Sequence, residues 1–144
     1  MTDPIQLANQ RFAQGLNCSQ AVFSAFASRS GLSDEIALRI ASPLGAGVAR
    51  QGQVCGALTG ALMALGIARG SATPEKKEET YRIAEELVAR FKELHGTILC
   101  HELIGYEIST KEGLQAAREN KAFASICPKL VEDAARLAAE FLAE

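Results

Sequence analysis

Four cysteines are the residues of this sequence best suited to chemistry. The 144-residue chain carries them at positions 18, 55, 100 and 127, so no two form a CxxC pair. This spacing lacks the close pairs that are typical of zinc fingers and of thioredoxin-like redox motifs. Permanent disulfides are rare in a reducing cytosol, so three states are open: free thiols, redox-cycling pairs or metal ligands.

All four cysteines are predicted to lie at helix N-termini. Asn17 is a favourable N-cap immediately before the first cysteine, and Pro128 after the last one is typical of the first helical position. Unpaired N–H groups and the helix dipole stabilise negative charge there, so we expect the thiol pKa values to be lowered. The alternative is that the cysteines are inert core residues, because free cysteine is often buried.

Residues 46–68 contain the most apolar segment of the chain, which follows a glycine-rich loop and Cys55. No charged residue lies between Val54 and Ala68, and Gly56 and Gly60 are four positions apart. Glycines at this spacing share one helix face and allow another backbone to approach closely. The apolar run is shorter than the ~20 residues that span a bilayer, so it is predicted to be a buried core helix.

Apolar residues recur at helical spacing along most of the remaining chain, and no stretch alternates with a period of two. The expected helices cover approximately residues 4–13, 18–30, 34–42, 55–68, 74–95, 100–104 and 127–141, with 106–119 partly helical. We therefore expect an all-α fold, with residues 1–144 forming a single-domain bundle of about six or seven helices around the central Gly/Ala-rich helix.

Composition and charge narrow the function classes. Hydrophobic residues make up 48% of the chain, charged residues 22%, and the formal net charge is −2. These values are typical of a globular protein and give no basic field for nucleic acid or anionic membranes. The N-terminal residues lack the apolar segment of a signal peptide, so a cytoplasmic protein that is not integral to a membrane is expected.

Several of these features occur together in one known family. The segments NCSQAV at 17–22 and CGALTG at 55–60, the loop 45–52 and the single cysteines at 100 and 127 resemble the C_GCAxxG_C_C family of redox-active proteins. The match covers nearly the full length of the chain. The resemblance implies a small bacterial or archaeal protein, and many members are encoded near transporter genes.

The resemblance also implies an active set: Cys18, Cys55, Cys100 and Cys127. Gly56 and Gly60 would be structural, and Cys55 is expected to be the leading reactive thiolate, with another cysteine resolving its disulfide. In the alternative chemistry the four thiolates hold zinc or an iron–sulfur cluster. The redox partner or small-molecule substrate is not specified by the sequence.

Outside the cysteines, three residues are candidates for a site. His101 is either a ligand or base beside Cys100, or a histidine on a surface turn. Arg50 lies in the loop 45–52, which resembles an anion cradle without the Lys-Ser/Thr of a P-loop, and is a candidate ligand for a small anionic substrate. His95 is interpreted as structural. Glu85, Glu86, Glu132 and Asp133 are interpreted as a solvated face.

Three functions remain open from the sequence. The first is dithiol–disulfide exchange, and the second is a metal- or cluster-binding module. The third is a non-catalytic accessory protein, associated with a transporter system, whose cysteines only pack. A homodimer that completes the apolar face of the central helix is a further expectation.

Overall fold

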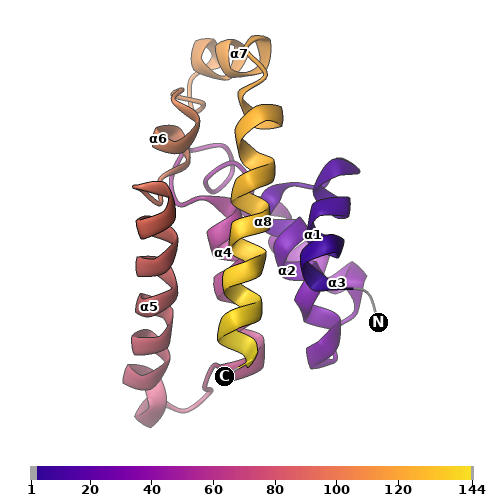
Figure 1. Ribbon diagram of the computed structural model, residues 1–144, viewed down its shortest axis with the longest axis vertical. Helices are drawn as coiled ribbons and strands as arrows, with labels where there is room; N and C mark the ends of the chain where they lie inside the picture. Colours follow the sequence, from indigo (N-terminus) through magenta and orange to yellow (C-terminus); the bar gives the residue numbers. More distant parts are fainter. Residues whose placement is uncertain (1–2, 144) are drawn as a thin grey trace.

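The computed structural model describes residues 3–143 and is built from helices (Figure 1). The α-helices are α1 Pro4–Ala13, α2 Cys18–Ala27, α3 Asp34–Ala41, α4 Gly56–Arg69, α5 Lys77–His95, α6 Cys100–Ile104, α7 Lys111–Glu119 and α8 Ala122–Ala143. The 3-10 turns are η1 Ser28–Ser30, η2 Ser42–Leu44 and η3 Pro74–Lys76. Between residues 3 and 143 there is no β-strand, so the all-α prediction is confirmed.

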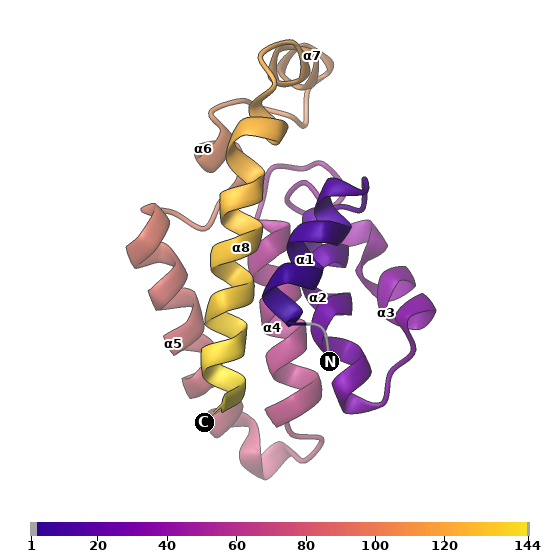
Figure 2. The same cartoon turned by 45° about the vertical axis from the view of Figure 1, so that its right-hand side comes forward.

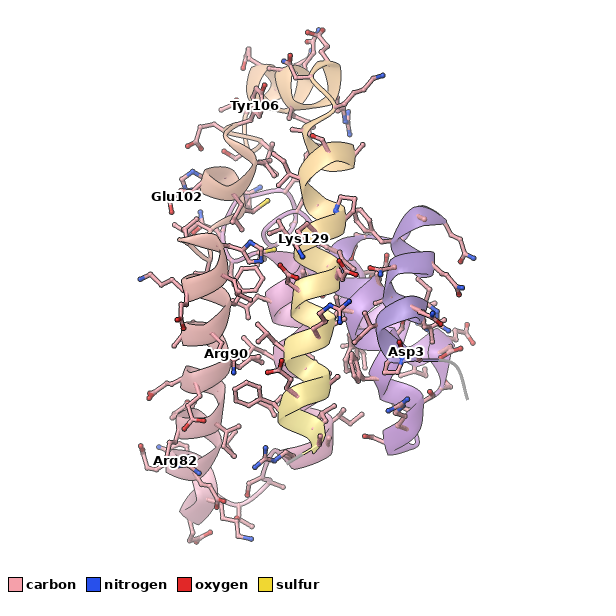
Figure 3. The ribbon with its side chains drawn as sticks, in the orientation of Figure 1. Asp3, Arg82, Arg90, Glu102, Tyr106 and Lys129 are labelled. Carbon is pink, nitrogen blue, oxygen red and sulfur yellow. The ribbon has the colours of Figure 1, made fainter. Side chains whose placement is uncertain are left out.

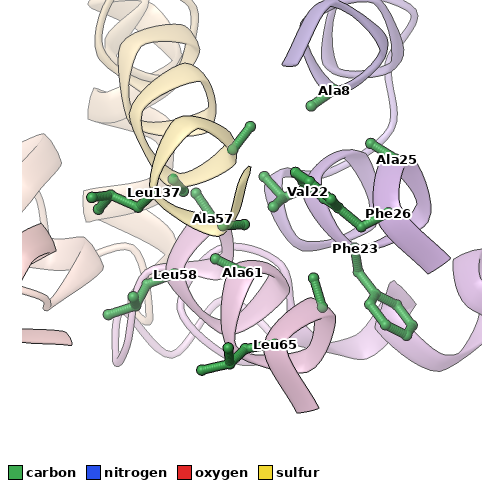
Figure 4. Close-up of a cluster of buried hydrophobic side chains, with 14 of the residues drawn as sticks. Ala8, Val22, Phe23, Ala25, Phe26, Ala57, Leu58, Ala61, Leu65 and Leu137 are labelled. Carbon is green, nitrogen blue, oxygen red and sulfur yellow. The ribbon is translucent and has the colours of Figure 1, made fainter. Parts of the chain in front are cut away.

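Helix α4 lies in the middle of the bundle. It packs most extensively against α2 and α8, and also contacts α5. Figure 2 shows α1, α2 and α3 on one side of α4 and α8, with α5 on the other side. Figure 4 shows the core between these helices, where Val22 and Phe26 of α2 face Ala57 and Ala61 of α4. The apolar segment predicted to be a core helix is therefore buried inside a protein core.

Helices α2 and α4 approach each other closely at glycine. A Cβ atom placed on Gly60 would lie 2.9 Å from the carbonyl oxygen of Ser19 and 3.0 Å from Cβ of Val22. Both distances are shorter than ordinary van der Waals contacts, and the oxygen belongs to a backbone that cannot move alone. Gly60 therefore sets the spacing between the two helices that carry Cys18 and Cys55.

The start of α8 differs from the prediction. The helix begins at Ala122, so Pro128 lies inside it and not at its first position. A proline in a helix interior costs about 3 kcal/mol, because it removes one backbone hydrogen bond. Packing offsets this cost, since Ala122 is 4% exposed and Phe123 packs on the same apolar cluster.

Asp133 is buried, which corrects its assignment to a solvated face. The His95 Nε2 atom, at the end of α5, lies 3.1 Å from one Asp133 carboxylate oxygen, and Lys129 Nζ lies 3.0 Å from the other. Figure 3 shows Lys129 projecting from α8. A buried carboxylate needs such partners, and the His95 contact links the C-terminal end of α5 to the middle of α8.

The helices are also too short or too polar to cross a bilayer. Within residues 3–143, no helix combines the length and the apolar character that a membrane span requires.

Candidate functional site

Local hydrogen bonds hold Cys18 in the first turn of α2. The Asn17 side chain accepts from the Gln20 N–H at 2.9 Å, and the Gln20 side chain accepts from the Asn17 N–H at 3.0 Å. This reciprocal pair is a capping box, so the predicted N-cap role of Asn17 is confirmed. The Asn17 amide also donates to the carbonyl of Ser42, which fixes the loop after α3 beside Cys18.

A short antiparallel bridge brings together the two segments that carry Cys55 and Cys100. Val54 and Leu99 pair, the Cys55 N–H donates to the carbonyl of Ile98, and the Cys100 N–H donates to the carbonyl of Gln53. Cys55 is the N-cap of α4 and Cys100 is the first residue of α6. The bridge thus joins two segments that are 45 positions apart in the sequence.

The four cysteines line one cavity of about 510 Å³. Cys127 reaches it from the interior of α8, so the prediction that this cysteine occupies a helix N-terminus is wrong. Apolar side chains from three other places complete much of the wall: Phe12, Leu114 and Phe123. Cys55, Cys100 and Cys127 are 3%, 6% and 8% exposed, whereas Cys18 is partly exposed.

Cys18 lies against the start of α4. A Cβ atom placed on Gly56 would be 2.3 Å from Cys18 Sγ, so any side chain at position 56 would overlap the sulfur. Because Gly56 directly follows Cys55, the absence of a side chain there brings the two cysteines together. All four cysteines are free thiols in the structure.

The thiol pKa values are raised, which contradicts the expectation of lowered values. Burial is the main cause for all four: it raises the pKa of Cys100 from its ordinary value to about 11 and that of Cys127 to about 12. It also raises the pKa of Cys18 and that of Cys55. The desolvation of the thiolates here outweighs their stabilisation by the helix N-termini.

Repulsion between neighbouring thiolates is the second cause of the raised pKa values, and the charge on Cys18 affects each of the other three cysteines. A charge on Cys18 raises the pKa of Cys55, of Cys100 and of Cys127. Only groups that lie close together influence each other in this way, so the four thiols form one electrostatically coupled cluster around Cys18.

Backbone N–H groups act in the opposite direction, and most of them face Cys18. Hydrogen bonds from the backbone of Ala46, Ser19 and Gly56, and from Cys18 itself, lower its pKa against the effect of burial. The Cys55 thiol has two such donors, Ala57 and Leu58 in the first turn of α4. The predicted helix-end stabilisation is therefore present at these two cysteines but is outweighed by desolvation.

The loop that supplies the Ala46 donor has an unusual backbone. Gly47 and four residues with side chains, Ala46, Val48, Ala49 and Arg50, have φ between 52° and 69°, in the left-handed region. Hydrogen bonds across the loop hold this turn, such as those from the Ala49 N–H to the Pro43 carbonyl and from the Gln53 N–H to the Gly47 carbonyl. Each such L-residue is disfavoured by roughly 1–2 kcal/mol, so the surrounding structure must enforce the conformation.

Two arginines also line the cavity. Arg50 comes from the left-handed loop, and Arg118 comes from α7. Arg118 lies in the segment 106–119, where no site residue was predicted. It carried no recognisable signal, because an arginine on a polar helix is ordinary and only the fold brings it to the cysteines.

His101 is not part of the cavity wall. Its ring Nδ1 atom lies 3.1 Å from a Glu107 carboxylate oxygen, and its backbone N–H donates to the carbonyl of Gly52. The side chain is 28% exposed, which fits the surface-turn alternative better than a ligand role.

The geometry of the thiols does not match a metal centre. Across residues 3–143, no group of three or more His, Cys, Asp or Glu side chains is arranged to hold a metal ion. Zinc in a structural site takes four such ligands in tetrahedral geometry. The cysteines as arranged within residues 3–143 therefore do not fit zinc or an iron–sulfur cluster.

A family model covers most of this site. The model described as "Putative redox-active protein (C_GCAxxG_C_C)" matches residues 16–141, which include all four cysteines. The chain belongs to the C_GCAxxG_C_C family. Neither a curated protein nor a solved structure matches the chain.

The structure gives physical roles to the C_GCAxxG_C_C motif residues in this chain. Asn17 and Gln20 cap the helix that carries Cys18, while Gly56 and Gly60 let that helix approach α4. The single cysteines at 100 and 127 close the same cavity from α6 and α8. The motif residues thus meet in space although they span 110 positions, from 18 to 127.

Proposed function

We propose that this C_GCAxxG_C_C protein is a thiol–disulfide exchange protein in which Cys18 and Cys55 are the exchanging pair. The observation that carries the proposal is the packing of Cys18 Sγ against Gly56, next to Cys55, on a cavity lined by all four thiols. Disulfide formation needs two thiols whose Cα atoms lie within about 7 Å, so close packing of this kind favours it.

The exchange would proceed in two displacement steps. The Cys18 thiolate attacks one sulfur of a partner disulfide, and the other partner sulfur leaves as a thiolate. The Cys55 thiolate then attacks Cys18 Sγ in the mixed disulfide and expels the first partner sulfur. Cys18 and Cys55 are thereby oxidised to a disulfide, and the partner is reduced to two thiols that receive the two protons from the cysteines.

We assign the attacking role to Cys18 and the resolving role to Cys55, which reverses the expectation from the sequence. Cys18 is partly exposed and has four backbone donors to stabilise its thiolate, whereas Cys55 is 3% exposed. An attacking thiolate must reach its substrate, while a resolving thiol must reach only its neighbour.

The raised pKa values fit a protein that favours its disulfide form. A thiol with a high pKa is a poor leaving group, so a disulfide made from such thiols is broken slowly. A protein that does not stabilise the thiolate also does not favour its dithiol form over its disulfide form. Burial raises the pKa of both Cys18 and Cys55 and therefore works in this direction. Cys100 and Cys127 line the same cavity, which supports a further exchange in which these two cysteines take over the disulfide.

Trapping of a mixed disulfide tests the order of attack. The Cys55→Ser variant, treated with bis(2-hydroxyethyl) disulfide, should accumulate a mixed disulfide on Cys18, which peptide mass spectrometry locates. The Cys18→Ser variant should react at least ~10-fold more slowly, because its remaining thiols are buried. Cys127→Ser serves as the matched control and should form the Cys18–Cys55 disulfide without a trapped intermediate. Equal trapping in the Cys18→Ser and Cys55→Ser variants would refute the assignment.

Metal content and thiol reactivity of the unmodified protein distinguish exchange from the two alternative functions, a metal-binding module and a non-catalytic accessory protein. Anaerobically purified protein containing one zinc, or iron with sulfide, per chain would favour a metal-binding module. Thiols that react with iodoacetamide only after unfolding would favour a non-catalytic accessory protein.

A further inference from the structure

We propose that the cysteine cavity is a binding site for small anionic disulfides, whose carboxylate groups pair with Arg50 and Arg118. This inference rests on the proposed exchange function and names the class of substrate that the site would take. It concerns a small molecule, because a cavity of about 510 Å³ lies within the size range of small-molecule pockets.

The charges on the cavity wall favour an anion. The lining residues include two arginines and no aspartate or glutamate. Neither Arg50 nor Arg118 forms an ion pair with another residue between positions 3 and 143. Guanidinium groups that are not neutralised by the protein are available for a carboxylate, which they bind through paired hydrogen bonds.

Helix ends add to the same field. The N-termini of α2 and α4 reach the cavity at Cys18 and Gly56, and neither helix carries an acidic residue in its first turn. The positive ends of both dipoles are thus uncompensated by side chains. The formal net charge of the chain is −2, so the positive field belongs to this cavity and not to the protein as a whole.

The two arginines come from different elements, so a ligand that pairs with both would bridge the loop and α7. Arg50 belongs to the loop after η2, and Arg118 to the last turn of α7. Phe12, Leu114 and Phe123 supply apolar surface on the same wall for the methylene groups of a short chain. A short-chain disulfide with a carboxylate at each end carries an anion for each arginine, methylene groups for the apolar side chains and sulfur for the cysteines.

The reaction with such a molecule is the two-step exchange described above. Cys18 and Cys55 lose two electrons and two protons to form their disulfide, and the anionic disulfide gains them and leaves as two anionic thiols. No further oxidant or reductant is needed for this half-reaction.

Three disulfides of similar length test the charge preference. 3,3′-Dithiodipropionate is anionic, its diamide is neutral with nearly the same shape, and cystamine is cationic. Each rate of oxidation of the reduced protein is divided by the rate for 2-mercaptoethanol, a thiol without a charged group, which corrects for intrinsic reactivity. We expect the dicarboxylate to exceed the diamide by about 10-fold, the effect of one or two charge-assisted hydrogen bonds, and cystamine to react more slowly than both.

Arginine variants locate the preference. Arg50→Gln and Arg118→Gln should each reduce the dicarboxylate-to-diamide ratio by about fivefold, and the ratio cancels any effect of the substitution on the reactivity of the thiols themselves. Arg29→Gln, in η1 and outside the cavity wall, is the matched control and should keep the full ratio. Calorimetry with octanedioate, which has the length of the dicarboxylate disulfide but no sulfur, measures binding without reaction and should lose affinity in the same two variants.

Two contrasting outcomes distinguish the anion site from the exchange function. Equal corrected rates for the three disulfides, with no binding of octanedioate, would overturn the anion site while leaving thiol exchange intact. Binding of octanedioate with no reaction of any disulfide would support the anion site and overturn the exchange function.

Discussion

At the scale of single residues, Cys18 differs from the other three cysteines. It is partly exposed, it touches the first residue of α4, and its charge raises the pKa of every other thiol in the cavity. Four backbone donors oppose the cost of its burial. These features support the proposed role of Cys18 as the attacking thiol.

The raised pKa values predict a shifted pH dependence of thiol alkylation. A group whose folded-state pKa exceeds its ordinary value loses its proton at higher pH. The reactive thiolate therefore forms at higher pH in the folded protein than in the unfolded protein. The iodoacetamide rate at Cys100, whose pKa is raised to about 11, should still rise above pH 9. Peptide mass spectrometry after timed alkylation gives this rate for each cysteine.

The urea-unfolded protein is the control for this profile. Its cysteines are exposed to water, so their alkylation rates should reach half of their plateau near the ordinary thiol pKa of about 8.5. A folded-state profile that levels off below pH 8 would contradict the assignment of raised values.

At the scale of elements, the left-handed loop is the least ordinary part of the chain. It brings the Ala46 N–H to Cys18 and places Arg50 on the cavity wall. Strained backbone of this kind is often found at functional sites, where the surrounding contacts maintain it. The loop is therefore the element on which both the thiolate and the proposed anion site depend.

Two substitutions in this loop should have different effects on stability. A Cβ atom at Gly47 would lie 2.5 Å from the Gln53 nitrogen, so Gly47→Ala should lower the free energy of unfolding by about 1–3 kcal/mol. Ala49→Gly relieves left-handed strain but increases unfolded-state entropy, so its net effect should stay within about 1 kcal/mol. Urea unfolding of both variants measures the difference, and a Gly47→Ala variant as stable as the parent would argue against this path of the loop.

Most helices could be predicted from the sequence, because apolar spacing and caps are local signals. Asn17, Ser33 and Gly96 mark helix boundaries that the structure reproduces. The predicted start of α8 is too late, because Pro128 is a local signal whose cost is offset by packing that the sequence does not display. Left-handed φ values at Val48 and Ala49 could not be predicted either, since neither residue favours them.

At the scale of the whole molecule, the site exists only because the bundle folds. The cysteines come from α2, the start of α4, α6 and α8, and no local segment contains two of them. The sequence indicated which residues belong to the set, but not their raised pKa values, since burial and mutual repulsion arise from tertiary contacts. Arg118 could not be assigned to the site for the same reason.

A disulfide map of the mildly oxidised protein tests the Cys18–Cys55 exchange most directly. Reduced protein is oxidised anaerobically with one equivalent of a small disulfide, alkylated, digested without reductant and analysed by mass spectrometry. We expect an intramolecular bond between Cys18 and Cys55, a loss of two free thiols per chain, and full recovery with reductant. Four alkylated cysteines after oxidation, or a first disulfide that leaves out Cys18, would contradict the proposed exchange.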